Sequence, residues 1–338
     1  MRIAVQGRRI REGIVNPVLS HASALEYWRS VRVGSRHFRR VTQVKKLASI
    51  PPNCSELAEP GPWWLSRPLH VIVSDAAARR DSREVVSHLW SSSLPKGTVL
   101  DSENGFCICS PELTFLQMAD ALDVVDLVEL AYELCGTYDV STSELRPCAP
   151  LTSVEKLSAF IGKAEGVRGR RKALRALRYV ADGAASPRET VLAMLLCLPY
   201  GLGGYRFELP VLNYRIDVGA RARKVTTKQF YRCDLYWPSA KLALEYDSDA
   251  EHLGSRSAAR DSSRRTALDA LGISVISVTT AQIASREETE RIAHHVAKRL
   301  GKRVQYREPE FSLACLQLRT RLLSARSTQW APVEAAGR

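Results

Sequence analysis

Residues 229–247 read QFYRCDLYWPSAKLALEYD, and this stretch decides the predicted fold of the C-terminal half of the chain. The segments 229–238 and 240–247 are rich in apolar and aromatic residues, as β-strands are. Residues 237–240, WPSA, predict a tight turn, because proline interrupts regular structure. The stretch therefore predicts an antiparallel β-hairpin.

Segments on both sides of this hairpin predict a layered sheet. Ser186 is a suitable N-cap and Pro187 suits a first helical turn, so a helix is expected over 186–198. Further strands are expected over 206–218 and 273–279, and further helices over 252–272 and 285–301. The order helix, three strands, helix, strand predicts an α/β fold with an α/β/α core.

Two acids of the hairpin are expected to lie close together. A four-residue loop would pair Tyr236 with Lys241. Asp234 then lies opposite Ala243, and Glu245 is its diagonal neighbour on the same face, roughly 7–8 Å away at the backbone. Two carboxylates at such a short distance repel each other unless a cation lies between them. Mg²⁺, which prefers carboxylate oxygens, water and phosphate, suits such a site.

This pair of acids has an ordinary alternative interpretation. Acids at strand ends often pair with nearby arginines, which are numerous in this region. Metal ligation is favoured by the setting of Glu245, because LALEYD is otherwise apolar and a strand buried on both faces rarely carries acids. A divalent ion here could activate water and stabilise the charge on a phosphate being cleaved.

The N-terminal half is predicted to be a mixed α/β domain. Apolar runs predict strands over 69–75 and 105–110, and periodic patterns predict helices over 21–30, 110–122 and 123–136. The polar stretch 137–150 contains two prolines and is the predicted boundary. The expected domains are 1–150, which selects a target or partner, 151–305, which carries the core, and 306–338, an amphipathic helix with a frayed tail.

Composition narrows the class of protein. The chain has 338 residues and a formal charge of +13, which favours polyanionic partners such as nucleic acid. It has no apolar run of about eighteen residues and no secretory signal pattern, so neither a membrane partner nor export is expected. Its eight cysteines contain no CxxC pair, which indicates reduced thiols and a cytoplasmic location.

A basic helix is expected over 168–183, RGRRKALRALRYVADG. Its cationic face, which includes Arg170, Arg171 and Lys172, either contacts phosphates or is simply solvated.

The C-terminal motifs resemble a known family. CDLYWPSAKLALEYDSDAEH, then RSAARDSSRR, then LGISVISVT occur in order over about residues 186–280. They look like the PD-(D/E)XK nuclease superfamily, and most of all like its very-short-patch-repair-like endonuclease domains, with a restriction-endonuclease-like core. More loosely, residues 69–138 resemble the region found upstream in AbiEi-type abortive-infection antitoxin relatives, which implies phage defence or toxin–antitoxin biology.

The resemblance implies roles for individual residues. Asp234 and Glu245 match the two metal-binding acids, and Asp247 stands where the broader superfamily places a catalytic lysine. His252 matches a histidine that transfers a proton or orients water, although a satisfied loop histidine is an equal alternative. The chain departs from the family at Ser248, where a glycine is usual, and at Glu251, which replaces one histidine of a frequent pair, so turn geometry and catalytic rate are in doubt.

Two further assignments stay open. Glu189 matches a glutamate that often serves as another metal ligand, but SPRE at 186–189 is also a capping box, in which Glu189 bonds back to the helix start. Arg256, Arg260 and Arg264 recur every four residues, so they share a helix face that contacts phosphate, pairs with acids or is solvated. Arg260 or Arg264 would supply the charge of the missing lysine.

The sequence thus predicts an endonuclease that depends on Mg²⁺ or Mn²⁺ and hydrolyses DNA. The alternatives are a regulator that binds nucleic acid on a lapsed nuclease scaffold, and a basic protein that binds another protein through its N-terminal domain.

Overall fold

The computed structural model describes most of the chain. It covers residues 17–32, 39–40, 64–79, 81–91, 94–102, 106–140, 146–219, 223, 226, 228–247 and 255–324, with side chains at 39–40, 78 and 255–262 left undescribed. Both units combine helices with strands, which confirms the predicted α/β class. The chain forms two compact units, one of Met1–Ala121, Ala159–Arg171 and Glu334–Arg338, and one of Leu122–Ser158 and Lys172–Val333.

The first unit is built on a mixed sheet. Its strand order is β2-β5-β6-β1-β3-β4. The strands are β1 (Val18–Leu19), β2 (Arg39–Arg40), β3 (Leu69–Val73), β4 (Val85–Leu89), β5 (Val99–Asp101) and β6 (Cys107–Cys109). Helices α1 (His21–Val31) and α3 (Pro111–Ala121) pack against each other, and the short helix η1 covers Ala76–Ala78. Buried Tyr27, Phe106 and Phe115 fill its core.

The second unit begins earlier than predicted. Its helix α4 (Val124–Cys135) packs against α7 (Pro187–Cys197), and the Thr137 N–H donates to the Ala184 carbonyl at 2.7 Å. This division differs from the predicted boundary at residue 150, because these contacts join α4 and the polar stretch to the C-terminal half of the chain. Strands β7 (Tyr138–Asp139) and β8 (Arg146–Pro147) pair within that stretch. Helices α5 (Val154–Lys163) and α6 (Arg170–Leu177) each contribute residues to both units.

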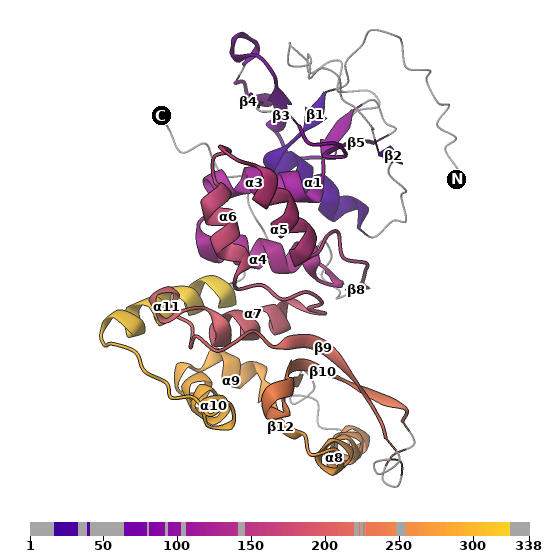
Figure 1. Cartoon of the computed structure of the whole chain (residues 1–338), viewed down its shortest axis with the longest axis vertical. Coiled ribbons are helices and arrows are strands. Elements are labelled where there is room, and N and C mark those ends of the chain that lie inside the picture. The colour runs from indigo at the N-terminus through magenta and orange to yellow at the C-terminus, as the bar shows by residue number, and fades with distance from the viewer. Residues whose placement is uncertain are drawn as a thin grey trace. The chain divides into compact units, whose positions relative to one another are not determined.

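The sheet of the second unit has the order β12-β11-β10-β9. Strands β9 (Val211–Asp217), β10 (Phe230–Trp237) and β11 (Leu242–Asp247) are antiparallel to their neighbours in turn, and β12 (Ser274–Thr279) runs parallel to β11. Helix α8 (Ser255–Ala270) packs on this sheet through a core that includes Ala267 and Leu268. The predicted order of helix, three strands, helix and strand over 186–279 is confirmed (Figure 1).

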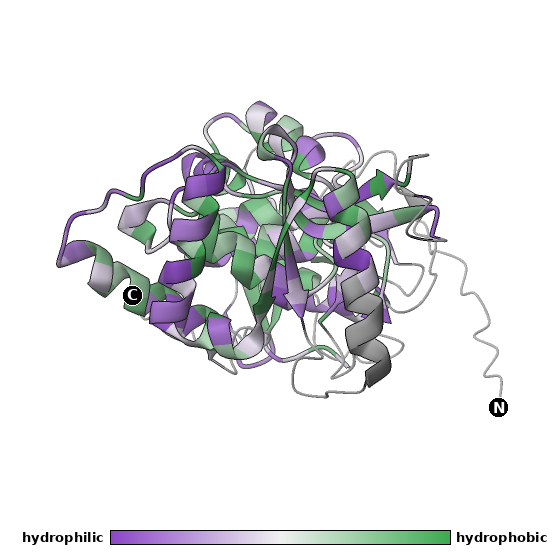
Figure 2. Cartoon of the chain, turned by 90° about the horizontal axis from the view of Figure 1, so that it is seen from below, coloured by the Kyte–Doolittle hydropathy of each residue, from purple (hydrophilic) through white to green (hydrophobic). Residues whose placement is uncertain are grey.

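The C-terminal helices complete this unit. A short helix α9 (Thr280–Ala284), which the sequence pattern did not reveal, precedes α10 (Arg286–Arg299). Helix α11 (Glu310–Leu323) packs on α7 and on the short helix η2 (Tyr200–Leu202), so it belongs to this unit and is not a separate segment. Figure 2 shows hydrophobic and hydrophilic residues mixed along the strands, while several helices carry hydrophilic residues along one side.

The predicted register of the β10–β11 hairpin is wrong by two residues. Tyr236 pairs with Ala243 instead of Lys241. The reason is the turn, in which residues 238–240 form the short helix η4 and Lys241 takes the left-handed conformation at φ 46° and ψ 45°. Lys241 is therefore part of the turn and not the first residue of the strand.

The described cysteines are mostly buried. Seven described cysteines are free, and six of them are buried, Cys148 being the intermediate one.

Among the helices that the structure describes, none is long and apolar enough to cross a membrane.

Candidate active site at the fork between β10 and β11

The two central strands separate at the predicted acids. Pairing of β10 with β11 runs from Trp237–Leu242 to Leu235–Leu244. Beyond that point β10 continues to pair with β9, and β11 continues with β12. Asp234 and Glu245 are the next residues on the two strands, so they lie opposite each other where the sheet forks.

Asp234 fills the gap that the fork leaves in the hydrogen-bond ladder. Its Oδ2 accepts the backbone N–H of Tyr246 at 2.7 Å. This bond fixes the carboxylate between the strands and satisfies a partly buried N–H at the point where they separate. Burial raises the pKa of Asp234, while the Tyr246 N–H and the charge of Arg264 act in the opposite direction.

The two carboxylate oxygens of Glu245 have different surroundings. Its side chain is 13% exposed, and Oε2 accepts a hydrogen bond from Arg264 Nη2. Oε1 is buried and receives no nitrogen or oxygen donor from the described residues, with the Cys233 thiol beside the carboxylate. Burial raises the pKa of Glu245, and the nearby charge of Asp234 raises it further. A cation would therefore be stabilised beside these oxygens.

Arg264 ties the fork to helix α8. Its Nη2 also donates to the backbone carbonyl of Arg232, and its guanidinium carbon lies 5.9 Å from the centre of the Tyr231 ring. The charges of the two acids keep the pKa of Arg264 above its usual range despite burial. The alternative that a strand acid pairs with an arginine is thus realised at Glu245.

Glu189 approaches the site but is held by the start of its own helix. Oε1 accepts the Ser186 hydroxyl at 2.9 Å, and Oε2 accepts the Ala185 N–H at 2.9 Å and Asn213 Nδ2 at 2.6 Å. Burial, with the charge of Asp234 adding to it, raises the pKa of Glu189 to about 7. These bonds favour the capping interpretation. The backbone N–H that Glu189 accepts is that of Ala185, however, and not that of Ser186 as in a standard capping box.

The remaining predicted residues are only partly described. Asp247 ends β11 beside Thr279 of β12. His252, with Ser248 and Glu251, lies outside the described residues, and Arg256 and Arg260 lie on α8 without described side chains. Within the described part of the chain, no group of three or more His, Cys, Asp or Glu side chains is arranged to hold a metal ion.

Two cationic side chains of the basic helix α6 form hydrogen bonds within the protein. Arg170 donates to the carbonyls of Ile161 and Gly162 at 3.0 and 2.9 Å, and Lys172 Nζ donates to the Leu122 carbonyl at 2.7 Å. Both side chains thereby cap the ends of other helices. Arg171 is exposed, so among these three it is the one most accessible to a phosphate.

Sequence reasoning missed Asn213. This residue lies on β9 with φ 49°, and its Nδ2 donates to both Glu189 and the Gly183 carbonyl, the latter at 3.0 Å. Asparagine is one of the few residues that tolerates this conformation, so an asparagine inside a strand pattern was the signal that could have revealed it.

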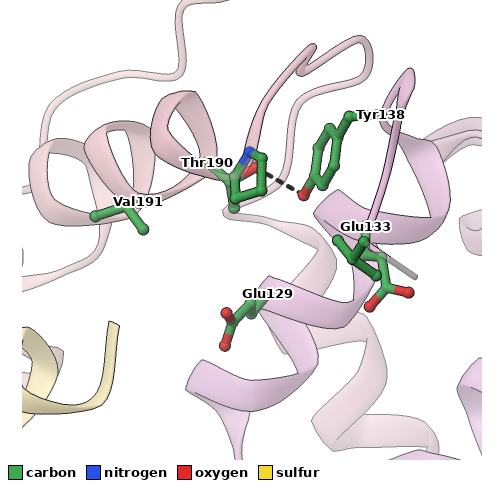
Figure 3. A pocket seen from close by; sticks show the side chains of 7 residues that line it. Glu129, Glu133, Tyr138, Thr190 and Val191 are labelled. Carbon is green, nitrogen blue, oxygen red and sulfur yellow. Dashed lines mark hydrogen bonds between the residues drawn. The ribbon is translucent and has the colours of Figure 1, made fainter. Parts of the chain in front are cut away.

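A separate pocket lies elsewhere in the second unit. Its lining comes from α4, β7, α7 and Val140, with Glu129, Glu133 and Thr190 among the residues drawn in Figure 3. The hydroxyls of Tyr138 and Thr190 are 3.1 Å apart at its wall. No lining residue belongs to β10 or β11, so this pocket is distinct from the fork.

Comparison with known proteins identifies relatives but no family. The chain is 31% identical over 137 residues to an uncharacterised protein of Mycobacterium tuberculosis strain CDC 1551 / Oshkosh, and equally to one of strain ATCC 25618 / H37Rv. Each alignment covers 40% of this chain and 45% of the relative. No family model matches the chain, and no solved structure matches it.

Proposed function

We propose that this protein is a Mg²⁺-dependent endonuclease that hydrolyses phosphodiester bonds in DNA, with its active site at the fork. The observation that carries the proposal is the pair of partly buried, mutually repelling carboxylates of Asp234 and Glu245, with Glu245 Oε1 left without a nitrogen or oxygen donor among the described residues. Such a pair suits a hard cation whose other ligands are water and phosphate.

The residues of the fork have separable roles in this proposal. Asp234 and Glu245 would hold the ion, which when bound supplies a Lewis acid and an activated water. Asp234 is oriented by the Tyr246 N–H, so its position does not depend on the ion. Arg264 lies where positive charge can stabilise a phosphate in the transition state, in place of the lysine that Asp247 replaces.

The experiment is cleavage of supercoiled plasmid with Mg²⁺ or Mn²⁺. Wild-type protein is expected to nick the plasmid, and Asp234→Asn and Glu245→Gln are expected to abolish nicking. Asp269→Asn removes an exposed acid from the end of α8 and serves as the matched control. Equal nicking by wild type and Asp234→Asn, or no nicking by any of them on DNA or RNA, would reject hydrolysis at this site.

A second function is supported by Arg264. Because this arginine already neutralises Glu245, the same scaffold can serve a regulator that binds nucleic acid without cutting it. That function predicts salt-sensitive binding in the presence of EDTA, with no cleavage when metal is added. The setting in phage defence or a toxin–antitoxin system, and a protein partner for the first unit, stay predictions.

A further inference from the structure

The outer part of the β9–β10 hairpin exposes aromatic and cationic side chains together. Among the described residues, six large hydrophobic side chains are exposed, and three of them, Val211, Tyr214 and Phe230, lie on β9 and β10, the strands labelled in Figure 1. Phe230 is the one at the outer end, because it pairs with Asp217 while Val211 pairs with Tyr236. Phe230 is 38% exposed. An exposed apolar residue is ordinary by itself, but Phe230 is surrounded by cations.

Cations surround the exposed ring. The guanidinium carbon of Arg215 lies 4.2 Å from the centre of the Phe230 ring, and Lys228 Nζ lies 5.4 Å from the centre of the Tyr231 ring. Phe230 and Arg232 alternate with buried residues along β10, so they share its exposed side. We call Arg215, Lys228, Phe230 and Arg232 the hairpin surface.

Two arginines of the hairpin surface face each other across the strands. Arg232 is the direct partner of Arg215 in the β10–β9 register. Like charges in that position destabilise a sheet unless an anion lies near them. Asp217 pairs with Arg215 at 2.9 Å, but both side chains are largely exposed, and Arg232 has no ion pair among the described residues. The surface therefore keeps a positive excess that suits phosphate.

The hairpin surface adjoins the fork along β10. Arg232 precedes Asp234 by two residues, which is roughly 7 Å along a strand. The Arg232 carbonyl accepts Arg264 Nη2, the group that also binds Glu245. Arg264 and the Cys233 thiol reach Glu245 from the side of β10 that carries Tyr231, so the hairpin surface adjoins the fork from the other side of the sheet.

We infer that the hairpin surface binds an unpaired nucleic-acid strand next to the fork, with Phe230 and the Arg215 guanidinium stacking on a base and Arg232 contacting phosphate. Aromatic faces stack on bases that are splayed out, which duplex bases are not. The inference rests on the proposed function, because it names the substrate class for the same site.

The test is fluorescence anisotropy of a labelled single-stranded DNA oligonucleotide with the full-length protein in EDTA. Phe230→Ala is expected to weaken single-strand binding about tenfold and to leave duplex binding nearly unchanged. Phe230→Tyr should restore it, since the tyrosine ring also stacks. Arg232→Gln is expected to weaken both single-strand and duplex binding and to lower the salt slope by about 0.7.

Controls come from another face of the second unit. Leu313→Ala on α11 and Arg299→Gln on α10 remove an exposed apolar group and an exposed cation, and neither should change binding. The inference would be overturned if Phe230→Ala bound single-stranded DNA as tightly as wild type, or if Phe230→Ala lost single-strand and duplex binding equally. It would also be overturned if the wild-type protein bound no single-stranded DNA. EDTA removes the metal ion, so the binding assay does not depend on catalysis. If the wild-type protein binds single-stranded DNA in EDTA but does not nick plasmid with Mg²⁺, the inference about the hairpin surface stands and the proposed nuclease activity is rejected.

Discussion

Arg264 and Glu245 form the ion pair of the fork. The Arg264 side chain is 30% exposed and that of Glu245 is 13% exposed, so the pair is only partly screened by water. Glu245 also faces the charge of Asp234, which raises its pKa. Arg264 is therefore the cation that makes two adjacent carboxylates tolerable in the folded protein.

Replacing Arg264 with methionine should expose that dependence. Arg264→Met keeps the apolar bulk and leaves Glu245 without its cation, so we expect the free energy of unfolding to fall by about 2 kcal/mol. Urea unfolding near neutral pH measures it. Arg265→Met, which removes the exposed neighbouring arginine, should change stability by less than about 0.5 kcal/mol.

A double variant distinguishes loss of the ion pair from loss of packing as the cause of the lower stability. Adding Glu245→Gln to Arg264→Met removes the stranded charge, so the double variant should be more stable than Arg264→Met alone. If Mg²⁺ binds at the fork, it should raise the Tm of Arg264→Met more than that of wild type. A double variant less stable than Arg264→Met would show that packing, and not charge, dominates.

Single residues also mark what the sequence could and could not reveal. Strand alternation was sufficient to bring Asp234 and Glu245 together, because a two-residue register error leaves each side chain on the same face. The partners of Glu189 were not predictable, since the choice between metal ligand and helix cap depends on Ala185 and Asn213. The role of His252 stays a prediction.

Among the elements, the turn between β10 and β11 explains the register. A four-residue loop was the simplest interpretation of WPSA, and the loop does have four residues. It covers 238–241 instead of 237–240, with Lys241 in a left-handed conformation, so the turn lies one residue later than expected. Lysine carries no signal for that conformation, which sterically favours glycine and asparagine. The strands themselves were predictable because their apolar side chains are buried.

Relieving the strain at this turn should stabilise the protein. Lys241→Asn places a residue that tolerates positive φ at the same backbone, so we expect a gain of about 0.5–1 kcal/mol in the free energy of unfolding. Lys241→Ala removes the same charge without relieving the strain, and it should give no gain. Chemical denaturation of the three proteins measures the difference. Equal gains for alanine and asparagine would attribute the effect to charge.

At the scale of the whole molecule, the first unit contains histidines with lowered pKa values and the second unit contains a carboxyl group with a raised pKa. In the first unit, His21 stacks on His88 at 3.7 Å between ring centres, and His70 Nδ1 lies 2.8 Å from His88 Nε2. Burial, helped by His70 and by Arg79 and opposed by Asp81, lowers the pKa of His88 to about 4. In the second unit, burial raises the pKa of Glu189 to about 7.

Acid should therefore act on the two units in opposite directions. A histidine with a lowered pKa contributes stability that is complete above pH 6.5 and is lost as pH falls toward about 4, by up to about 3 kcal/mol. A carboxyl with a raised pKa opposes folding above pH 7, and protonation removes that cost as pH falls toward about 4.5. Calorimetry at about pH 7.5 and about pH 5 should show the first unit's transition moving down and the second unit's moving up.

Two neutral substitutions assign these transitions. His88→Gln keeps a polar partner for His70 but cannot be protonated, so the acid-sensitive transition should lose much of its shift. Glu189→Gln mimics the protonated carboxyl, so the other transition should stay near its acidic position at neutral pH. The sequence could not predict this contrast, because the histidines are far apart along the chain and meet only through β3, β4 and the start of α1. A single transition that moves in one direction for all three proteins would refute the opposed response.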